Sequence, residues 1–269
     1  MKQLIFAGRS FYAIALVVYG VQQCYFRTFR DVFFSPYQDK LPLLSALAIV
    51  FGLYLIATGI LIFIPARAKK AALLLGAVFM GLLLGAQLTY ELFSQPNKLY
   101  HLGLWTAPLK ELALAGGAFV VAGSFETDPS SKKSFLEKLI PYGNLFFLIT
   151  ISSFGISHII YADYIQDLVP AGMANHLFWV NVTGICLLAA GVSIILGIRI
   201  RPIALLLSVM IFLWVWLVHL PGTLSHPLAA DRGNLLASTF DALAFSGTAL
   251  LIALTMKKQQ WIECIENWR

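Results

Sequence analysis

Residues Gly52–Leu75 read GLYLIATGILIFIPARAKKAALLL, and residues Gly184–Leu207 read GICLLAAGVSIILGIRIRPIALLL. Ten of these 24 positions are identical without a gap, among them two glycines seven residues apart and an arginine eight residues after the second glycine. Each stretch contains an apolar run of helical length, a short basic connection and the start of a second apolar run. The match predicts that a unit of membrane-spanning helices occurs twice in the chain.

The composition agrees with a chain embedded in a membrane. Of the 269 residues, 59% are hydrophobic and 12% are charged, and the mean hydropathy is +0.80. A soluble domain carries roughly 25% charged residues, so a water-soluble globule is excluded. The net charge of +6 does not indicate nucleic-acid binding, because basic residues in a membrane protein set its topology.

Eight stretches are long and apolar enough to cross a bilayer, whose core needs roughly 20 apolar residues in helical form. They cover approximately residues 8–26, 44–64, 71–92, 105–124, 141–160, 177–197, 202–220 and 235–256. We expect the first to remain as a span, because no small-residue cleavage site follows it. The predicted fold class is all-α, a polytopic membrane protein whose eight transmembrane helices form two parallel four-helix repeats.

The spans also predict domains and topology. We expect an N-terminal four-helix unit at residues 1–125, a cytoplasmic linker at 126–140, a C-terminal four-helix unit at 141–256 and a cytoplasmic tail at 257–269. An even number of spans puts both termini on one side. That side holds 13 of the 19 basic residues: Lys2, Arg9, Arg67, Lys69, Lys70, Lys132, Lys133, Lys138, Arg199, Arg201, Lys257, Lys258 and Arg269. The positive-inside bias therefore predicts cytoplasmic termini.

Short motifs in the C-terminal half resemble the DoxX family of bacterial membrane proteins. They are Gly155-Ile156-Ser157-His158, Leu168-Val169-Pro170, His176-Leu177-Phe178-Trp179, Thr183-Gly184, Ala189-Ala190-Gly191 and Val218-His219-Leu220-Pro221. The resemblance covers the C-terminal half closely and the N-terminal half only through the repeat. It implies four-helix units in the bacterial cytoplasmic (inner) membrane and an association with redox enzymes, since the family is named after a subunit associated with a quinol oxidase. It assigns no catalytic residue to this chain.

The residues with proton chemistry gather on one side of the expected topology. All five histidines fall at or near the non-cytoplasmic surface, where His158 closes the fifth span and His219 closes the seventh. Asp241 lies some seven residues inside the eighth span. A carboxylate there costs roughly 2.5–3.5 kcal/mol unless it is protonated, paired or facing a wet cavity. We expect His219 or His158 to be its partner and the three residues to form a catalytic, proton-exchanging cluster.

A second set of polar residues surrounds this cluster or repeats it. Ser157, His176 and Asn181 lie nearby in the sequence of the C-terminal half. In the N-terminal half, Gln23, Gln87 and Glu111 match His158, His219 and Asp241 through the repeat. We infer that one copy kept a proton-active site and the other a structural one. The alternative is that all of these groups only join helices within the bundle.

No cofactor is fixed by the spacing of the residues. Two histidines from separate spans can ligate haem iron, and tryptophans can line a quinone site, but the cofactor stays open. We predict no metal site, since no His-x-x-x-His, Cys-x-x-Cys-His or carboxylate run occurs. Cys24, Cys186 and Cys264 are expected at different depths, which disfavours a thiol-relay enzyme. The long segments 27–43 and 161–176 are expected to form short amphipathic helices at the membrane interface.

Three functions remain open. The first is a redox-associated accessory subunit, rather than a stand-alone enzyme, that contacts protons or quinol through the His/Asp cluster and docks with a redox-complex partner protein. The second is a proton-coupled small-solute carrier in which the duplicated halves enclose a pathway. The third is a structural assembly factor. The predicted partners are the lipid bilayer and, for the first function, a redox-complex partner protein. The sequence leaves the oligomeric state open.

Overall fold

The computed structural model describes residues 1–34, 42–94, 96–126, 134–228, 231–256 and 261. The described residues form helices and connecting turns without a β-strand, and eight of the helical segments are long and apolar enough to cross a membrane. This confirms the predicted all-α polytopic class. The expected linker residues 127–133 and the expected tail, except Trp261, lie outside the described residues.

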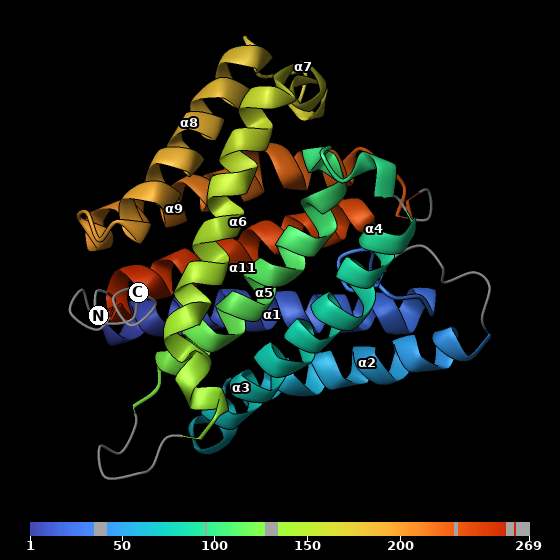
Figure 1. Cartoon of the computed structure of the whole chain (residues 1–269), viewed down its shortest axis with the longest axis vertical. Helices are drawn as coiled ribbons and strands as arrows, with labels where there is room; N and C mark the ends of the chain where they lie inside the picture. The colour runs from blue at the N-terminus through green and yellow to red at the C-terminus, as the bar shows by residue number, and fades with distance from the viewer. Residues whose placement is uncertain (35–41, 95, 127–133, 229–230, 257–260, 262–269) are drawn as a thin grey trace.

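Six spans are single helices: α1 (Lys2–Phe26), α2 (Pro42–Leu61), α5 (Thr106–Gly123), α6 (Ile140–Ile160), α8 (His176–Ile195) and α11 (Asn234–Thr255). The third span consists of α3 (Pro65–Leu82), a π-helical turn (Leu83–Gln87) and α4 (Leu88–Ser94). The seventh span consists of α9 (Ile200–Trp214), a second π-helical turn (Val215–His219) and α10 (Leu220–Leu224). Shorter elements are α7 (Ala162–Ile165) and 3₁₀ turns at Pro96–Lys98, Leu102–Trp105, Leu136–Leu139 and Gln166–Leu168. The helices α1 and α11 run antiparallel, because Gly8 meets Gly247 while Tyr19 meets Asp241. We call the end where α1 begins and α11 ends the terminal end, and the opposite one the distal end (Figure 1).

Pro65 and Pro221 each lie in the first turn of a helical segment. Pro65 opens α3, because the first helical turn tolerates a residue without an N–H donor. Pro221 lies in the first turn of α10, directly after the π-helical turn that ends at His219. A π turn alters the ladder of backbone hydrogen bonds, so a proline beyond it does not end the span. The third and seventh spans are therefore longer than predicted.

The two halves pack in corresponding ways. In the N-terminal half α1 packs against α2 and α3 against α5; in the C-terminal half α6 packs against α8 and α9 against α11. The halves join through α5 against α6 and α11 against α1, and α5 also meets α11. Figure 1 shows α5 and α11 in the middle of the bundle, and they are the most deeply buried of the eight spans.

Close glycine contacts recur at equivalent crossings. A Cβ atom on Gly52 would lie 2.7 Å from the Gly20 carbonyl oxygen where α1 crosses α2, and one on Gly155 would lie 2.7 Å from the Gly184 carbonyl oxygen where α6 crosses α8. Small residues allow this approach of helices in a membrane. The two π-helical turns also match, since each lies within the third span of its half. They end at Gln87 and His219. These pairs fix which residues of the two halves are equivalent.

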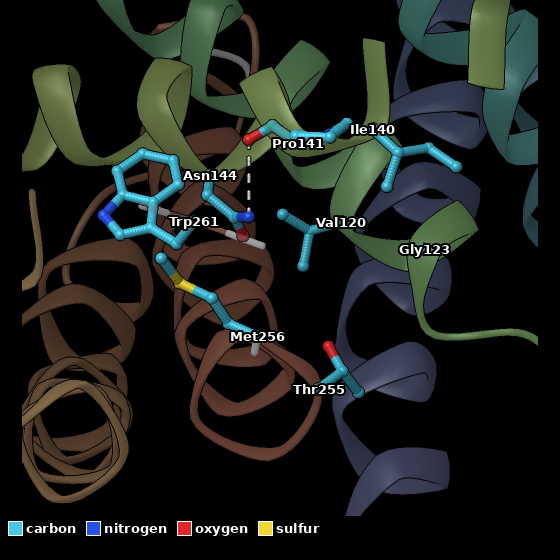
Figure 2. Close-up of a pocket in the computed structure, with 8 residues that line it drawn as sticks. All are labelled: Val120, Gly123, Ile140, Pro141, Asn144, Thr255, Met256 and Trp261. Atoms are coloured by element: carbon cyan, nitrogen blue, oxygen red, sulfur yellow. Dashed lines mark hydrogen bonds between the residues drawn. The ribbon is translucent and has the colours of Figure 1, made fainter. Parts of the chain in front are cut away.

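A small cavity lies at the terminal end. Figure 2 shows it between the ends of α5, α6 and α11, and its volume is about 100 Å³. Trp261 lines it and donates a hydrogen bond from Nε1 to the Ile195 carbonyl oxygen at 3.0 Å. The volume leaves room for only a few water-sized molecules.

Candidate functional site

A cavity of about 1440 Å³ lies at the distal end of the C-terminal half. Residues of α5, α6, α8, α9 and α11 form its walls, and the segment after α6 lies at its rim. The volume exceeds the roughly 300–1,000 Å³ of pockets for drug-sized ligands. All five histidines of the chain line this cavity: His101, His158, His176, His219 and His226.

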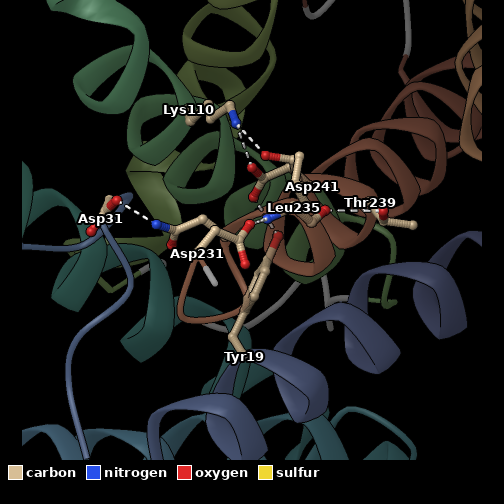
Figure 3. Close-up of polar contacts among 9 residues, drawn as sticks. Tyr19, Asp31, Lys110, Asp231, Leu235, Thr239 and Asp241 are labelled. Atoms are coloured by element: carbon tan, nitrogen blue, oxygen red, sulfur yellow. Dashed lines mark hydrogen bonds and ion pairs between the residues drawn. The ribbon is translucent and has the colours of Figure 1, made fainter. Parts of the chain in front are cut away.

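Asp241 is paired with Lys110 of α5 rather than with an imidazole. The Lys110 Nζ lies 2.9 Å from Asp241 Oδ2, and the Tyr19 hydroxyl donates to Asp241 Oδ1 at 2.6 Å. Figure 3 shows the carboxylate between these two side chains, with Lys110 also reaching Ser238 Oγ at 3.3 Å. The expected histidine partner is thus wrong in this structure, because a lysine and a tyrosine from neighbouring spans already satisfy both carboxylate oxygens.

The packing also shifts the alignment of α5 with α11 by one residue. Sequence matching pairs Glu111 with Asp241. However, Gly116 is the α5 residue that meets α6, and Gly247 is the α11 residue that meets α1. When these two glycines are matched, Lys110 takes the position of Asp241. The two charged residues therefore come from equivalent places in the halves, and they pair where α5 meets α11.

His219 lies near this ion pair, and His158 lies near His219. His219 ends the second π-helical turn and interacts electrostatically with Lys110, Asp241 and His158. The His158 Nδ1 lies 2.8 Å from the Phe154 carbonyl oxygen. Because a carbonyl only accepts, Nδ1 carries the proton and Nε2 is left as an acceptor. The three predicted catalytic residues therefore line one cavity, together with a lysine that the prediction did not include.

The other predicted polar residues of the C-terminal half divide between the cavity and its surroundings. Ser157 and His176 line the cavity, although the Ser157 hydroxyl also donates to the Ser153 carbonyl oxygen at 3.0 Å. Asn181 does not line it; its side chain donates to the Leu177 carbonyl oxygen at 2.9 Å within α8. The Asn181 side chain thus makes a hydrogen bond within its own helix.

The predicted residues of the N-terminal half lie outside the cavity and are fully buried: Gln23, Gln87 and Glu111. The Gln87 side chain donates to the Asp31 carbonyl oxygen at 2.7 Å. Within the described part of the chain, the side-chain polar atoms of Gln23 and Glu111 have no hydrogen-bond partner. The N-terminal half therefore places these polar groups in its core.

Aromatic residues form much of the apolar wall. Trp179 and Trp214 meet edge to face at 6.1 Å, and the Phe154 and Phe245 rings lie 6.4 Å apart. All four line the cavity. Among the described residues, the buried Trp214 Nε1 has no hydrogen-bond partner. The wall therefore suits an apolar ring or chain.

Sequence reasoning missed Tyr19 and Lys110 as members of the site. Lys110 lies beside Glu111 in the sequence, and the repeat matches Glu111 rather than Lys110 with Asp241. Tyr19 gave no signal, since a tyrosine in an apolar helix has no fixed role. The part of the chain that the structure describes contains no group of three or more His, Cys, Asp or Glu side chains placed to hold a metal ion.

Comparisons with family models, with curated proteins and with solved structures return no match for this chain. The fold and the site therefore define a multi-pass membrane protein with a histidine-lined distal cavity.

Proposed function

We propose that the chain is an accessory membrane subunit of a redox system whose distal cavity binds the ring of a membrane-soluble quinol and exchanges protons with it. One observation carries this proposal: five histidines and a buried Lys110–Asp241 pair line a large cavity with apolar and aromatic walls. An apolar wall accommodates a ring and its hydrocarbon chain, and imidazoles accept and release protons near neutral pH.

The residues would divide the chemistry as follows. Oxidation of a quinol to a quinone releases two protons and two electrons. His158 Nε2 would accept a proton from a quinol hydroxyl, and His219 lines the same cavity as His158 and the ion pair. The electrons would pass to a redox centre of a partner protein. The resemblance to DoxX proteins supports a place in the bacterial inner membrane, and the distribution of basic residues supports cytoplasmic termini and a cavity open to the outer side.

The packing below the cavity favours this function over a solute carrier. A carrier needs a path from the distal to the terminal end. Beneath the ion pair, residues 113–122 of α5 and 249–253 of α11 are buried against their neighbours. Two closely packed central helices leave such a path no room in this conformation.

Binding of decylubiquinone to the protein in lipid nanodiscs tests the proposal. Quenching of tryptophan fluorescence should report binding, because Trp179 and Trp214 line the cavity. We expect His219→Gln, which installs the residue found at the equivalent Gln87, to weaken binding about tenfold, as the loss of one hydrogen bond of about 1.4 kcal/mol would do. Asn181→Ala is the matched control outside the cavity. Equal binding by the parent and His219→Gln, or no saturable quenching, contradicts the proposal.

A further inference from the structure

The place in the N-terminal half that corresponds to the cavity is filled by the chain that follows α1. Phe33 stacks on Phe79 of α3 with 5.1 Å between ring centroids, and it meets Phe51 and Tyr19 edge to face at 5.5 and 5.6 Å. Its side chain is fully buried. The described part of the expected interfacial helix at 27–43 therefore lies inside the bundle, where aromatic rings on three spans hold it.

The equivalent positions of the C-terminal half are open. Matching Gly20 with Gly155 makes Phe154 the equivalent of Tyr19. Matching the π-helical turns makes Ile211 the equivalent of Phe79. Both Phe154 and Ile211 line the cavity. The cavity is thus the space that the chain after α1 occupies in the other half.

The chain after α6 lies at the rim of this space. Counted from the matched glycines, Leu168 corresponds to Phe33 and Tyr164 corresponds to Phe29. Leu168 is 59% exposed and Tyr164 is 71% exposed, although both line the cavity. Figure 1 shows α7 at the top of the view, beside the start of α8. Two large apolar side chains therefore stand at the mouth of an apolar cavity without being packed in it.

We propose that residues 161–171 are a movable plug that enters the cavity as residues 27–34 enter the N-terminal half, and that the structure shows the plug withdrawn. In the inserted form Leu168 packs against Ile211. His219 then donates to a backbone carbonyl of the plug, as Gln87 does to Asp31. The plug and a cavity ligand compete for the same space, so the plug regulates access to the site of the proposed function.

Two differences explain why one segment is fixed and the other is movable. In the N-terminal half, Arg27 adopts a left-handed conformation with φ 54°, which ends α1 and turns the chain inward. The equivalent Ala162 is helical instead and opens the further helical turn α7. Arg30 then anchors the fixed segment: its buried guanidinium donates to the Arg232 carbonyl oxygen and to Thr28 Oγ1. Ile165, at the place of Arg30, cannot make these hydrogen bonds.

Disulfide trapping tests the plug without a ligand. In a variant with the native cysteines replaced by serine, Leu168→Cys and Ile211→Cys should cross-link under mild oxidation. Leu168→Cys with Val209→Cys is the matched control, because Val209 is 49% exposed on the outer surface of α9. Adding Ala162→Gly should raise the cross-linked fraction at least twofold, since glycine adopts the left-handed conformation freely.

The outcomes separate the plug from the proposed ligand. Saturating decylubiquinone should lower the cross-linked fraction at least twofold. Cross-linking that decylubiquinone leaves unchanged still supports the plug and counts against quinol as the ligand. The positive control is Phe33→Cys with Phe79→Cys, which should cross-link under the same conditions. If it does, and the Leu168→Cys/Ile211→Cys pair cross-links no more than the control pair both with and without Ala162→Gly, the plug is overturned.

Discussion

Asp241→Asn removes the charge at the floor of the cavity and leaves the Lys110 ammonium without its counter-ion. The Asp241 side chain is 5% exposed and that of Lys110 is 23% exposed. Removing one member of a buried ion pair costs about 3–5 kcal/mol, and the exposure of the lysine places this pair at the lower limit, about 3 kcal/mol. A change of 1 kcal/mol shifts Tm by about 2–4 °C in a chain of this size class, so we expect Tm to fall by about 6–12 °C.

Thermal unfolding in detergent, followed by intrinsic fluorescence, measures this effect. Adding Lys110→Met to Asp241→Asn should restore at least half of the lost Tm, because the unpaired charge is then absent. Asp163→Asn, an exposed acid on α7, is the control and should leave Tm unchanged. If the double variant loses the sum of the two single losses, the residues are not coupled and the reasoning about the pair is refuted.

Three further variants test other parts of the structure, the first and third by the same Tm measurement and the second by size-exclusion chromatography. Tyr19→Phe should destabilise the protein by about 1.5–3 kcal/mol, the range for a hydrogen bond to a charged group. The control Tyr25→Phe, at an exposed tyrosine, should leave Tm unchanged. Equal Tm values for the two variants would contradict the hydrogen bond. Gly155→Leu should separate α6 from α8, so that the purified protein is no longer monodisperse. Gly172 has open space around it, so the control Gly172→Leu should stay monodisperse. A stable, monodisperse Gly155→Leu protein would contradict the close crossing. Phe33→Ala should cost about 3–5 kcal/mol, as expected for a buried phenylalanine, and a loss below about 1 kcal/mol would show that the N-terminal half is not filled by this side chain.

The spans could be predicted because the bilayer imposes one rule on all of them. A run of about 20 apolar residues has no alternative to a helix in lipid, so the number and order of spans follow from hydropathy. Their ends could not be predicted equally well. Pro221 looks like a helix breaker in any sequence, and only the π-helical turn before it explains why the helix continues to Leu224.

The members of the site could be predicted in part, and their pairing could not. Histidines and a buried aspartate stand out in an apolar chain, so His158, His219 and Asp241 were recognised from composition and depth. The partner of Asp241 depends on the register of α5 against α11. A shift of one residue, set by the contact of Gly116 with α6, decides between Lys110 and Glu111.

The cavity itself left no trace in the sequence. The segments after α1 and after α6 have similar mixtures of aromatic and charged residues, and both were predicted to lie at the membrane surface. Only the structure shows that Phe33 is buried while Leu168 is exposed. The two segments differ in the conformation of one equivalent residue, left-handed at Arg27 and helical at Ala162, which no hydropathy pattern reports.

Photolabelling with an azidoquinone, followed by mass spectrometry of the labelled peptides, tests most directly whether the distal cavity is a quinol site. We expect the label to attach to cavity-lining residues of α6, α8 and the segment from α9 to α10. Excess decylubiquinone should prevent this labelling. Label spread over the lipid-facing surfaces of both halves, unaffected by decylubiquinone, would contradict the account.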